Sequence, residues 1–383
     1  MIWRCDLSRQ HADFKDEALA AMARVMESGV YILGPETRKF EEEFAAYIGM
    51  GHCVGVANAT DGLTLALMAL GIGAGHEVIT TPFTAIPTVS AIVDAGAKPV
   101  FVDINPDTYL LNTEQALAAV TPRTRAVMPV HIFGDVFDAA ELKKKLPPDV
   151  AVIEDAAQAH GASLGGVKAG AMGDMGVFSF YPTKNLGAYG DGGAVVANRP
   201  ELAERLRKLR MFGMVDKDHI DSPGVNSRLD EVQAAILRIK LRHLDRMNQR
   251  RHVIAERYKK LLPHDIFRYQ HLPENVVCNY HVFVAEVRER RDELIAYLAT
   301  RDIQTNVYYP LPLSRQKALA GLGYKDGDFP VAEELCRKIM ALPLYPEFPE
   351  SEQMTVIGAI NDFFNGQTKR SLRSSESTCA AGA

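Results

Sequence analysis

The chain has 383 residues, a length that predicts two domains of unequal size. Its 47% hydrophobic and 24% charged residues are typical of a soluble globular protein, which excludes a disordered or fibrous chain. The net charge of −5 argues against nucleic acid as a partner, because a nucleic-acid-binding face needs a basic excess.

Targeting signals, membrane spans and metal sites are not predicted either. The start, Met1 to Phe14, is interrupted by charges and lacks the apolar core of a signal peptide, and no run of about 18 apolar residues occurs. The cysteines are scattered without paired spacing: Cys5, Cys53, Cys278, Cys336 and Cys379. We therefore expect a cytoplasmic protein with no disulfide framework, no bound metal and no contact with a membrane.

From about residue 52 to residue 198, short apolar runs alternate with helical stretches. The predicted strands are 52–57, 77–81, 99–104, 125–131, 150–154, 176–180 and 193–197, and the predicted helices are 61–70, 86–95, 113–120 and 139–146. This alternation predicts an α/β fold whose central sheet is mainly parallel and covered by helices. Ligands of such sheets bind beyond the carboxyl ends of the strands.

The remaining chain has a different texture. Residues 227–262 form one long helical stretch, in which Leu229, Val232, Ile236 and Ile239 mark a single buried stripe. Shorter strands and helices follow, up to about residue 365. We predict a large domain over 1–240, a smaller C-terminal α/β domain over 241–365, and a disordered tail over 366–383, where no apolar period occurs.

The segment around Lys184 carries the strongest chemical signal. Lys184 leaves the predicted strand that ends near Ser179 and enters a loop that runs on to Gly190-Asp191-Gly192-Gly193. A lysine is usually a solvated surface residue, and only about 0.04% of a solvated lysine is neutral at pH 7. A Schiff base with an aldehyde cofactor removes that obstacle, because the amine is already condensed. The flanking apolar strand and glycines favour this function.

A second signal is the apolar strand that ends in Glu154 and Asp155 and is followed by Gln158. An acidic residue at a strand end can simply cap a loop. The functional hypothesis is that Asp155 lies beside a pyridine nitrogen, which stays protonated only next to an anion. Glu154 would then face the other side of the sheet, and Gln158 would suit a ring hydroxyl.

A third signal lies between a strand and a helix, where Asn58, Ala59 and Thr60 occur together. A helix N-terminus offers free N–H groups to a phosphate, although a plain N-cap by Asn58 or Thr60 would give the same pattern.

The glycine-rich run over residues 71–75 resembles a dinucleotide-binding fingerprint, but it follows a helix and precedes a strand. We interpret it as the loop at a helix C-terminus.

Together with Tyr31–Pro35 and Asn226–Ala235, these segments resemble the DegT/DnrJ/StrS-type sugar aminotransferases, which are fold-type I pyridoxal-phosphate enzymes. The resemblance covers nearly the whole chain. It implies that Lys184 bonds to pyridoxal 5'-phosphate, that Asp155 pairs with the ring nitrogen and that Gln158 contacts the ring hydroxyl. The residues that it assigns to the cofactor phosphate are Ala59, Thr60 and Ser179, with Asn226 from the neighbouring subunit of a homodimer whose active sites are shared.

The resemblance further implies transfer of an amino group, from glutamate, onto a nucleotide-linked keto sugar, with 3-keto favoured over 4-keto. The chain departs from the family twice. Ala85 stands where an aromatic residue often stacks on the cofactor, so either Phe83 or another side chain covers that face or the face is more open. Tyr308 and Tyr309 are expected to border the sugar pocket, but the histidines common there in relatives that use 3-keto sugars are missing. Packing at the domain junction is the alternative role of these two tyrosines.

Two alternative functions remain open. A sugar dehydratase or another lyase could use the same fold, but dehydratases of this group replace the lysine with histidine and Lys184 is present. A pyridoxal-phosphate-binding regulatory protein without turnover is disfavoured because Lys184, Asp155 and Gln158 are all retained. Conversion of the cofactor by glutamate would distinguish an aminotransferase from a regulator.

Overall fold

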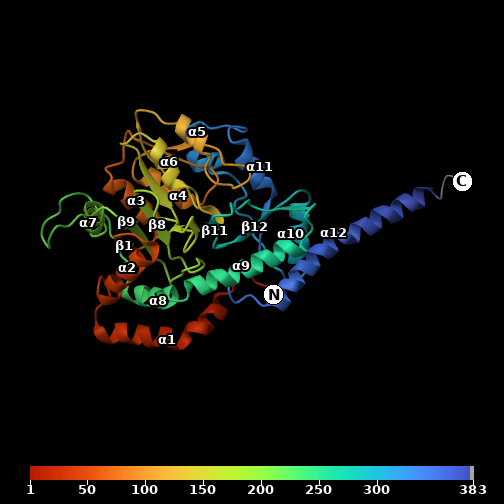
Figure 1. Ribbon diagram of the computed structural model, residues 1–383, viewed down its shortest axis with the longest axis horizontal. Helices are drawn as coiled ribbons and strands as arrows, with labels where there is room; N and C mark the ends of the chain where they lie inside the picture. The colour runs from red at the N-terminus through yellow and green to blue at the C-terminus, as the bar shows by residue number, and fades with distance from the viewer. Residues whose placement is uncertain (380–383) are drawn as a thin grey trace.

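The computed structural model of the chain describes residues 1–379, with side chains through residue 365. Within this range, a sheet of seven strands has the order β1-β9-β8-β5-β4-β2-β3 (Figure 1). Its strands are β1 (His52–Val56), β2 (Glu77–Thr80), β3 (Lys98–Phe101), β4 (Thr124–Val127), β5 (Ala151–Asp155), β8 (Met175–Ser179) and β9 (Gly193–Ala197). Each predicted strand of the large domain is therefore found.

The central sheet is mainly parallel, as predicted. Strands β3, β2, β4, β5 and β8 pair in parallel, and β9 lies antiparallel between β8 and β1. Nearly all residues of β2, β5, β8 and β9 are buried, which explains why these strands read as continuous apolar runs rather than as alternating patterns.

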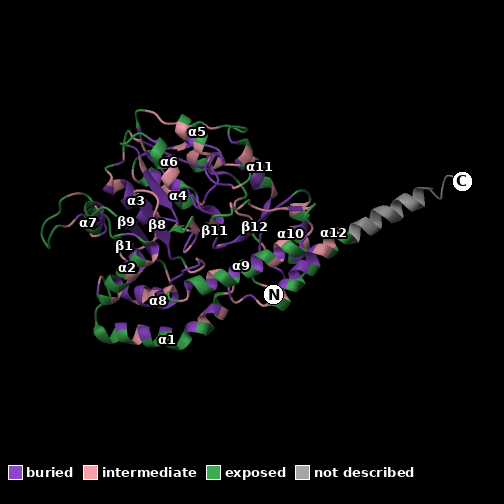
Figure 2. Ribbon diagram, in the orientation of Figure 1, coloured by how far each residue is buried: buried purple, intermediate pink, exposed green. Residues whose placement is uncertain are grey.

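Helices cover both faces of this sheet (Figure 2). One face packs against α3 (Ala59–Ala69), α4 (Ile86–Asp94) and α7 (Pro200–Leu209). The other face packs against α2 (Pro35–Ile48) and α8 (Glu231–Leu241), with α1 (Leu7–Ser28) packed on α8. The short helices α5 (Thr113–Ala118) and α6 (Ala139–Lys145) belong to a further core that includes residues of β3, β4 and β5.

The long helical stretch predicted over 227–262 is in fact two helices. α8 ends at Leu241 and α9 (Leu244–Leu261) begins after a break at residues 242–243. The buried side chains of α8 belong to the core under the central sheet, whereas Ile254 and Tyr258 of α9 belong to a separate C-terminal core. The start of α9 still packs in the core under the central sheet, through Leu244 and Met247, so α9 links the two cores.

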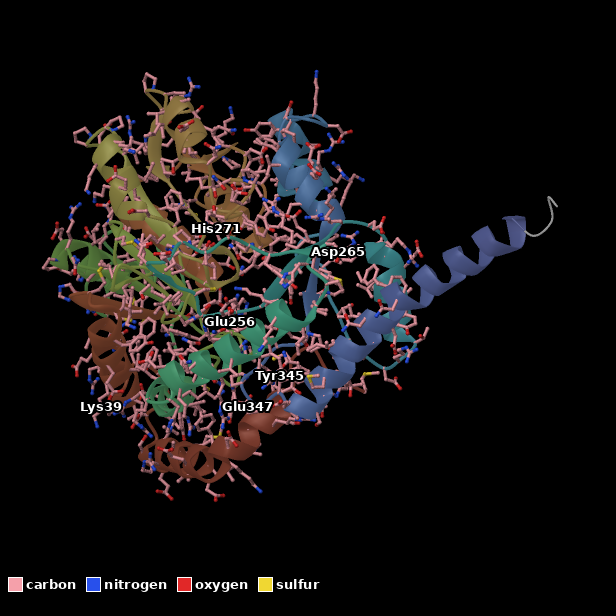
Figure 3. The ribbon with its side chains drawn as sticks, turned by 45° about the vertical axis from the view of Figure 1, so that its right-hand side comes forward. Lys39, Glu256, Asp265, His271, Tyr345 and Glu347 are labelled. Atoms are coloured by element: carbon pink, nitrogen blue, oxygen red, sulfur yellow. The ribbon has the colours of Figure 1, made fainter. Side chains whose placement is uncertain are left out.

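The C-terminal part is built on a second sheet with the order β10-β12-β13. Its elements are β10 (Phe267–Arg268), β12 (Phe283–Val287), β13 (Ile339–Leu342), α10 (Arg291–Ala299), α11 (Pro330–Lys338) and α12 (Glu350–Cys379). Figure 3 shows side chains between α9, which carries Glu256, and the segment with Tyr345 and Glu347, where Tyr345 joins the same core as Ile254.

Short elements connect these units: η1 (Ile132–Gly134), β6 (Ser163–Leu164), β7 (Val167–Lys168), β11 (Val276–Val277), η2 (Leu313–Arg315) and η3 (Lys317–Leu322). The N-terminal segment joins the C-terminal part, because Ile2 pairs with Ile303. The division into 1–240 and 241–365 stays a prediction.

The segment predicted to be a disordered tail, 366–383, is helical as far as Cys379. Extending an existing helix costs less than nucleating one, and α12 is already anchored by buried Val356 and Ile360. The side chains of this segment and residues 380–383 lie outside the described residues. In the described part of the chain, no helix has both the length and the apolar character needed to span a bilayer.

Candidate active site

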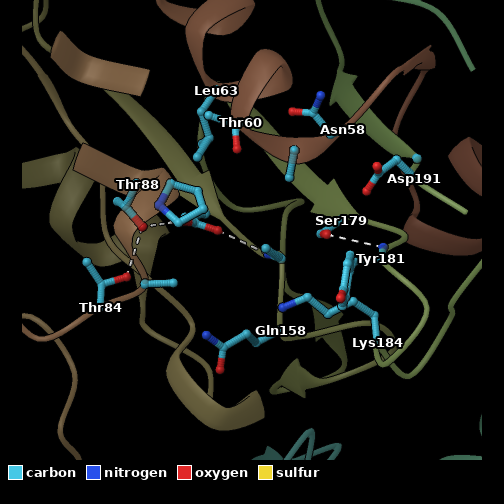
Figure 4. Close-up of a pocket in the computed structure, with 16 residues that line it drawn as sticks. Asn58, Thr60, Leu63, Thr84, Thr88, Gln158, Ser179, Tyr181, Lys184 and Asp191 are labelled. Carbon is cyan, nitrogen blue, oxygen red and sulfur yellow. Dashed lines mark hydrogen bonds between the residues drawn. The ribbon is translucent and has the colours of Figure 1, made fainter. Parts of the chain in front are cut away.

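A cavity of about 270 Å³ opens where β1, β5 and β8 end at their carboxyl sides (Figure 4). The lining residues are Asn58, Ala59, Thr60, Leu63, Thr84, Ala85, Pro87, Thr88, Asp155, Ala157, Gln158, Ser179, Tyr181, Lys184, Asp191 and Gly192. This is the sheet edge at which α/β folds bind ligands. The cavity brings together all the predicted site residues except Asn226, Tyr308 and Tyr309.

One end of the cavity is the N-terminus of α3. The side chain of Asn58 caps the helix by accepting the N–H of Asp61 at 2.9 Å. The N–H groups of Ala59 and Thr60 lie in the first turn of α3, where no carbonyl of the helix can accept their hydrogen bonds. They are therefore free to bind an anion. A Cβ on Gly193 would lie 2.8 Å from the Ala59 nitrogen, so only glycine lets β9 approach this turn. Asn58 thus caps the helix without occupying its anion-binding groups.

Asp155 presents a buried carboxylate to the cavity. The Thr88 hydroxyl donates to Oδ2 at 2.7 Å, and the N–H of Ala157 donates to Oδ1 at 3.2 Å. Burial raises the pKa of Asp155, while the Thr88 hydrogen bond and the charge of Lys184 oppose that rise. A buried carboxylate in this position favours a ligand that brings a positive charge.

Lys184 reaches into the same space from the loop after β8 (Figure 4). Burial lowers the pKa of its ammonium group to about 8, and the Asp155 carboxylate opposes the shift. A substantial share of the amine is therefore neutral near physiological pH, which is the form that attacks an aldehyde.

Gln158 has a fixed amide orientation. Its Oε1 accepts the N–H of Phe133 at 2.9 Å, so Nε2 is the donor, and it donates to the Tyr309 hydroxyl at 3.2 Å. The second N–H of the amide stays available to a ligand. Tyr309 therefore meets the cavity through Gln158, and the Tyr308 ring lies 5.7 Å from that of Tyr309.

Two predicted positions lie differently from the rest. Asn226 is exposed, pairs with Met211 and is not among the residues that line the cavity of its own chain. Phe83, considered as a cover for the cofactor face beside Ala85, is fully buried against Phe133 and is not among the lining residues. Among the described residues that line the cavity, Tyr181 is the aromatic one.

Glu154 points to the opposite face of the sheet, as the alternation along β5 requires. Its carboxylate accepts the N–H groups of Gly170, Met172 and Gly173 at 2.9, 2.7 and 2.6 Å. His131 adds a contact at 2.8 Å through Nε2. Glu154 is therefore a structural residue, and of the two neighbouring carboxylates only Asp155 serves the cavity.

Sequence reasoning missed Thr88, Tyr181 and Asp191, which also line the cavity. Thr84 and Thr88 are hydrogen-bonded to each other at 2.9 Å. Thr84 precedes α4 and Thr88 lies in its first turn. Their place after the carboxyl end of β2 was a usable signal, because that edge of a parallel sheet binds ligands. Tyr181 and Asp191 belong to loops, where sequence gives no period to follow.

The residues around the cavity fit a phosphorylated pyridine aldehyde. Free N–H groups at α3 suit its phosphate, the buried Asp155 suits a ring nitrogen that carries a proton, and Lys184 is a partly neutral amine beside it. The fold and this site define a fold-type I pyridoxal-phosphate-dependent transferase.

Comparisons with known proteins agree. The model of the DegT/DnrJ/EryC1/StrS aminotransferase family matches residues 12–361. The dTDP-3-amino-3,4,6-trideoxy-alpha-D-glucose transaminase of Micromonospora megalomicea subsp. nigra is 45% identical, over 94% of this chain and 97% of that protein. The chain belongs to the DegT/DnrJ/EryC1/StrS aminotransferase family and is a pyridoxal-phosphate-dependent aminotransferase.

Two further similarities are informative. The crystal structure of S. venezuelae DesV in complex with a ketimine intermediate matches with a TM-score of 0.90 at 42% identity, covering 94% of this chain and 98% of that one. The pleiotropic regulatory protein of Geobacillus stearothermophilus is 44% identical, over 94% of this chain and 97% of that protein.

Proposed function

We propose that this aminotransferase moves an amino group from glutamate onto a nucleotide-linked 3-keto sugar. The observation that carries the proposal is the meeting of Lys184 and Asp155 in one cavity beside the free N–H groups of α3. The transaminase from Micromonospora, whose name places the amino group on carbon 3 of a dTDP-linked sugar, supports the sugar part.

The lining residues have distinct roles in this proposal. Lys184 Nζ holds the cofactor covalently and afterwards, as a free amine, moves the proton at the amino-bearing carbon of the donor. Asp155 holds a proton at the ring nitrogen, and the Gln158 amide donates to the ring hydroxyl. The N–H groups of Ala59 and Thr60 and the Ser179 hydroxyl bind the phosphate. Bound pyridoxal phosphate supplies the carbonyl that takes up the amino group and the electron-withdrawing ring.

We also propose a homodimer in which Asn226 reaches the phosphate of the neighbouring site. Tyr181, which lines the cavity, is 53% exposed in the single chain, and Ile86, between the lining residues Ala85 and Pro87, is 63% exposed. The loop after α7, which projects at the left of Figure 1, adds Ile220, exposed at 68%. Exposed large apolar side chains support a protein interface, and a second copy of this chain is the partner proposed here.

Tyr308 and Tyr309 are proposed to border the sugar pocket. Tyr309 supports this, because its hydroxyl accepts a hydrogen bond from Gln158, which lines the cavity.

We place the enzyme in the cytoplasm, and its free thiols at Cys5, Cys53 and Cys278 suit a reducing compartment.

The test is a pair of half-reactions. The loaded enzyme is first treated with ¹⁵N-glutamate and then, after removal of the donor, with nucleotide-linked 3-keto or 4-keto sugars. We expect the 3-keto sugar to gain ¹⁵N, as read by mass spectrometry, and Lys184→Ala to transfer none. Transfer to the 4-keto sugar alone would refute carbon 3 as the position of the keto group. Transfer from another amino donor but not from glutamate would refute glutamate as the donor.

A regulatory function without turnover is the second candidate, favoured by the name of the Geobacillus relative. The same experiment separates the two functions. A protein that only binds the cofactor leaves it unchanged in the presence of glutamate, whereas an aminotransferase converts it within the first half-reaction.

A further inference from the structure

Asn185, the residue directly after Lys184, carries a side chain with no apparent place in the chemistry. It is 2% exposed and does not line the cavity. Its Nδ2 donates to Asn248 Oδ1 on α9 at 2.8 Å and to the carbonyl of Asn279, before β12, at 2.9 Å. Its Oδ1 lies 3.2 Å from Nδ1 of His281. One buried amide therefore joins the lysine loop to two segments of the C-terminal part.

The directions of these hydrogen bonds are determined by one another. Both N–H groups of Asn185 are used, so its Oδ1 must accept and Nδ1 of His281 must carry the proton. Asn248 and Asn279 both donate through Nδ2 to the carbonyl of His160, at 2.8 and 3.0 Å. We call these three asparagines, with His281 and the His160 carbonyl, the asparagine network. Its amides are consistent with a single arrangement, which is the mark of a rigid, satisfied polar cluster.

The network also reaches a second part of the cavity wall, at Gln158. The N–H of His281 donates to the carbonyl of Phe133 at 3.0 Å, and the N–H of Phe133 donates to Gln158. A Cβ on Gly134 would lie 1.8 Å from Asn279 Oδ1, so glycine is what lets η1 approach the network this closely. Residues 279–281 thus hold both the loop of Lys184 and the turn that orients Gln158.

We propose that Asn185 is a positioning residue, and that the asparagine network fixes the orientation of Lys184 and couples it to α9 and the C-terminal sheet. The proposal rests on the proposed function of Lys184. A lysine side chain has many rotamers, and a reacting group must be held within a fraction of an ångström by its supporting shell. The residue bonded to Lys184 is anchored in α9 and before β12, so a movement of either element is transmitted to Lys184 through one peptide unit.

The ionisation of Lys184 reports on this coupling. Burial is what lowers its pKa to about 8, so a loosened loop that admits water should raise that value. The groups that face the ammonium are Asp155, from β5, and the imidazoles of His160 and His281. Burial lowers the pKa of His160 to about 3 and that of His281 well below its usual range, so both rings stay neutral during the titration.

The experiment measures the pH midpoint of Lys184 labelling by acetic anhydride in the full-length, cofactor-free chain, read by peptide mass spectrometry. The midpoint separates ionisation from reagent access. The variants are Asn185→Leu and, at a partly exposed position, Asn248→Ala. The matched control is Gln353→Leu, a fully buried amide that donates to the carbonyl of Ile254 on α9 and accepts from Arg257, outside the network.

We expect both network variants to raise the midpoint by about half a pH unit or more, which lowers the neutral fraction at pH 8 about twofold. The control should lower the melting temperature without moving the midpoint. Midpoints within about 0.2 unit of the wild type in both variants would overturn the proposal and leave the network a structural brace. If Asn185→Leu does not fold, Asn248→Ala decides the question. Borohydride trapping of the cofactor on another lysine would refute the proposed function and leave this midpoint readable.

Discussion

Lys184 should be an unusually reactive amine once the cofactor is removed. With a pKa near 8, about 9% of it is neutral at pH 7, against about 0.04% of a solvated lysine with a pKa near 10.4. The ratio is about 200-fold. The perturbation is therefore the pH itself, varied from 6 to 11 with trace acetic anhydride, and the assay compares labelling of the Lys184 peptide with that of a peptide carrying the exposed Lys217.

The negative charge of the neighbouring Asp155 provides a second test. Asp155 opposes the lowering of the Lys184 pKa, so Asp155→Asn should move the labelling midpoint further down, below about 8. A lowered pKa also means that the unfolded chain binds more protons between pH 8 and 10.4, so through Lys184 the stability of the cofactor-free protein rises over that window. A labelling midpoint of Lys184 near 10.4 would show that burial does not lower its pKa, and would contradict this prediction.

Three other changes test separate parts of the structure. In the loaded enzyme, Asp155→Asn should slow turnover about 10²–10⁴-fold, because the protonated ring nitrogen of the cofactor loses its buried partner. Near-normal turnover would make Asp155 a structural cap. Glu154→Gln should lower the free energy of unfolding by about 3–5 kcal/mol in urea, since four donors face that carboxylate, and unchanged stability would contradict the contacts. Tyr308→Phe should weaken kcat/KM for the keto sugar by about 1–2 kcal/mol and leave the glutamate half-reaction intact. If only the melting temperature falls, Tyr308 is a packing residue.

Much of the large domain could be predicted from the sequence because local pattern and global fold agree there. Strands buried on both faces have apolar runs, and each ends where polar residues begin, as Ile153 and Glu154 lead into Asp155. Those ends meet at one edge of a parallel sheet, so Asp155, Lys184 and the start of α3 could be expected to lie together. The glycine run over 71–75 was likewise correctly assigned to a helix end, with left-handed Gly71 and Gly75.

What the sequence could not reveal depends on contacts between distant segments. The break between α8 and α9 leaves the apolar stripe intact through Ile239, so no local pattern marks it. The burial of Phe83 depends on Phe133 and Tyr309, which come from other parts of the chain. The asparagine network joins residues up to 119 positions apart, so no local sequence pattern could predict it.

The role of Lys184 is tested most directly by identifying the lysine that holds the cofactor. Borohydride reduction of the loaded protein, followed by proteolysis and mass spectrometry, fixes pyridoxal phosphate to its lysine and identifies the peptide. We predict a single modified peptide containing Lys184, and none from Lys184→Ala. A cofactor fixed to a different lysine in the wild-type protein would contradict the account of this site.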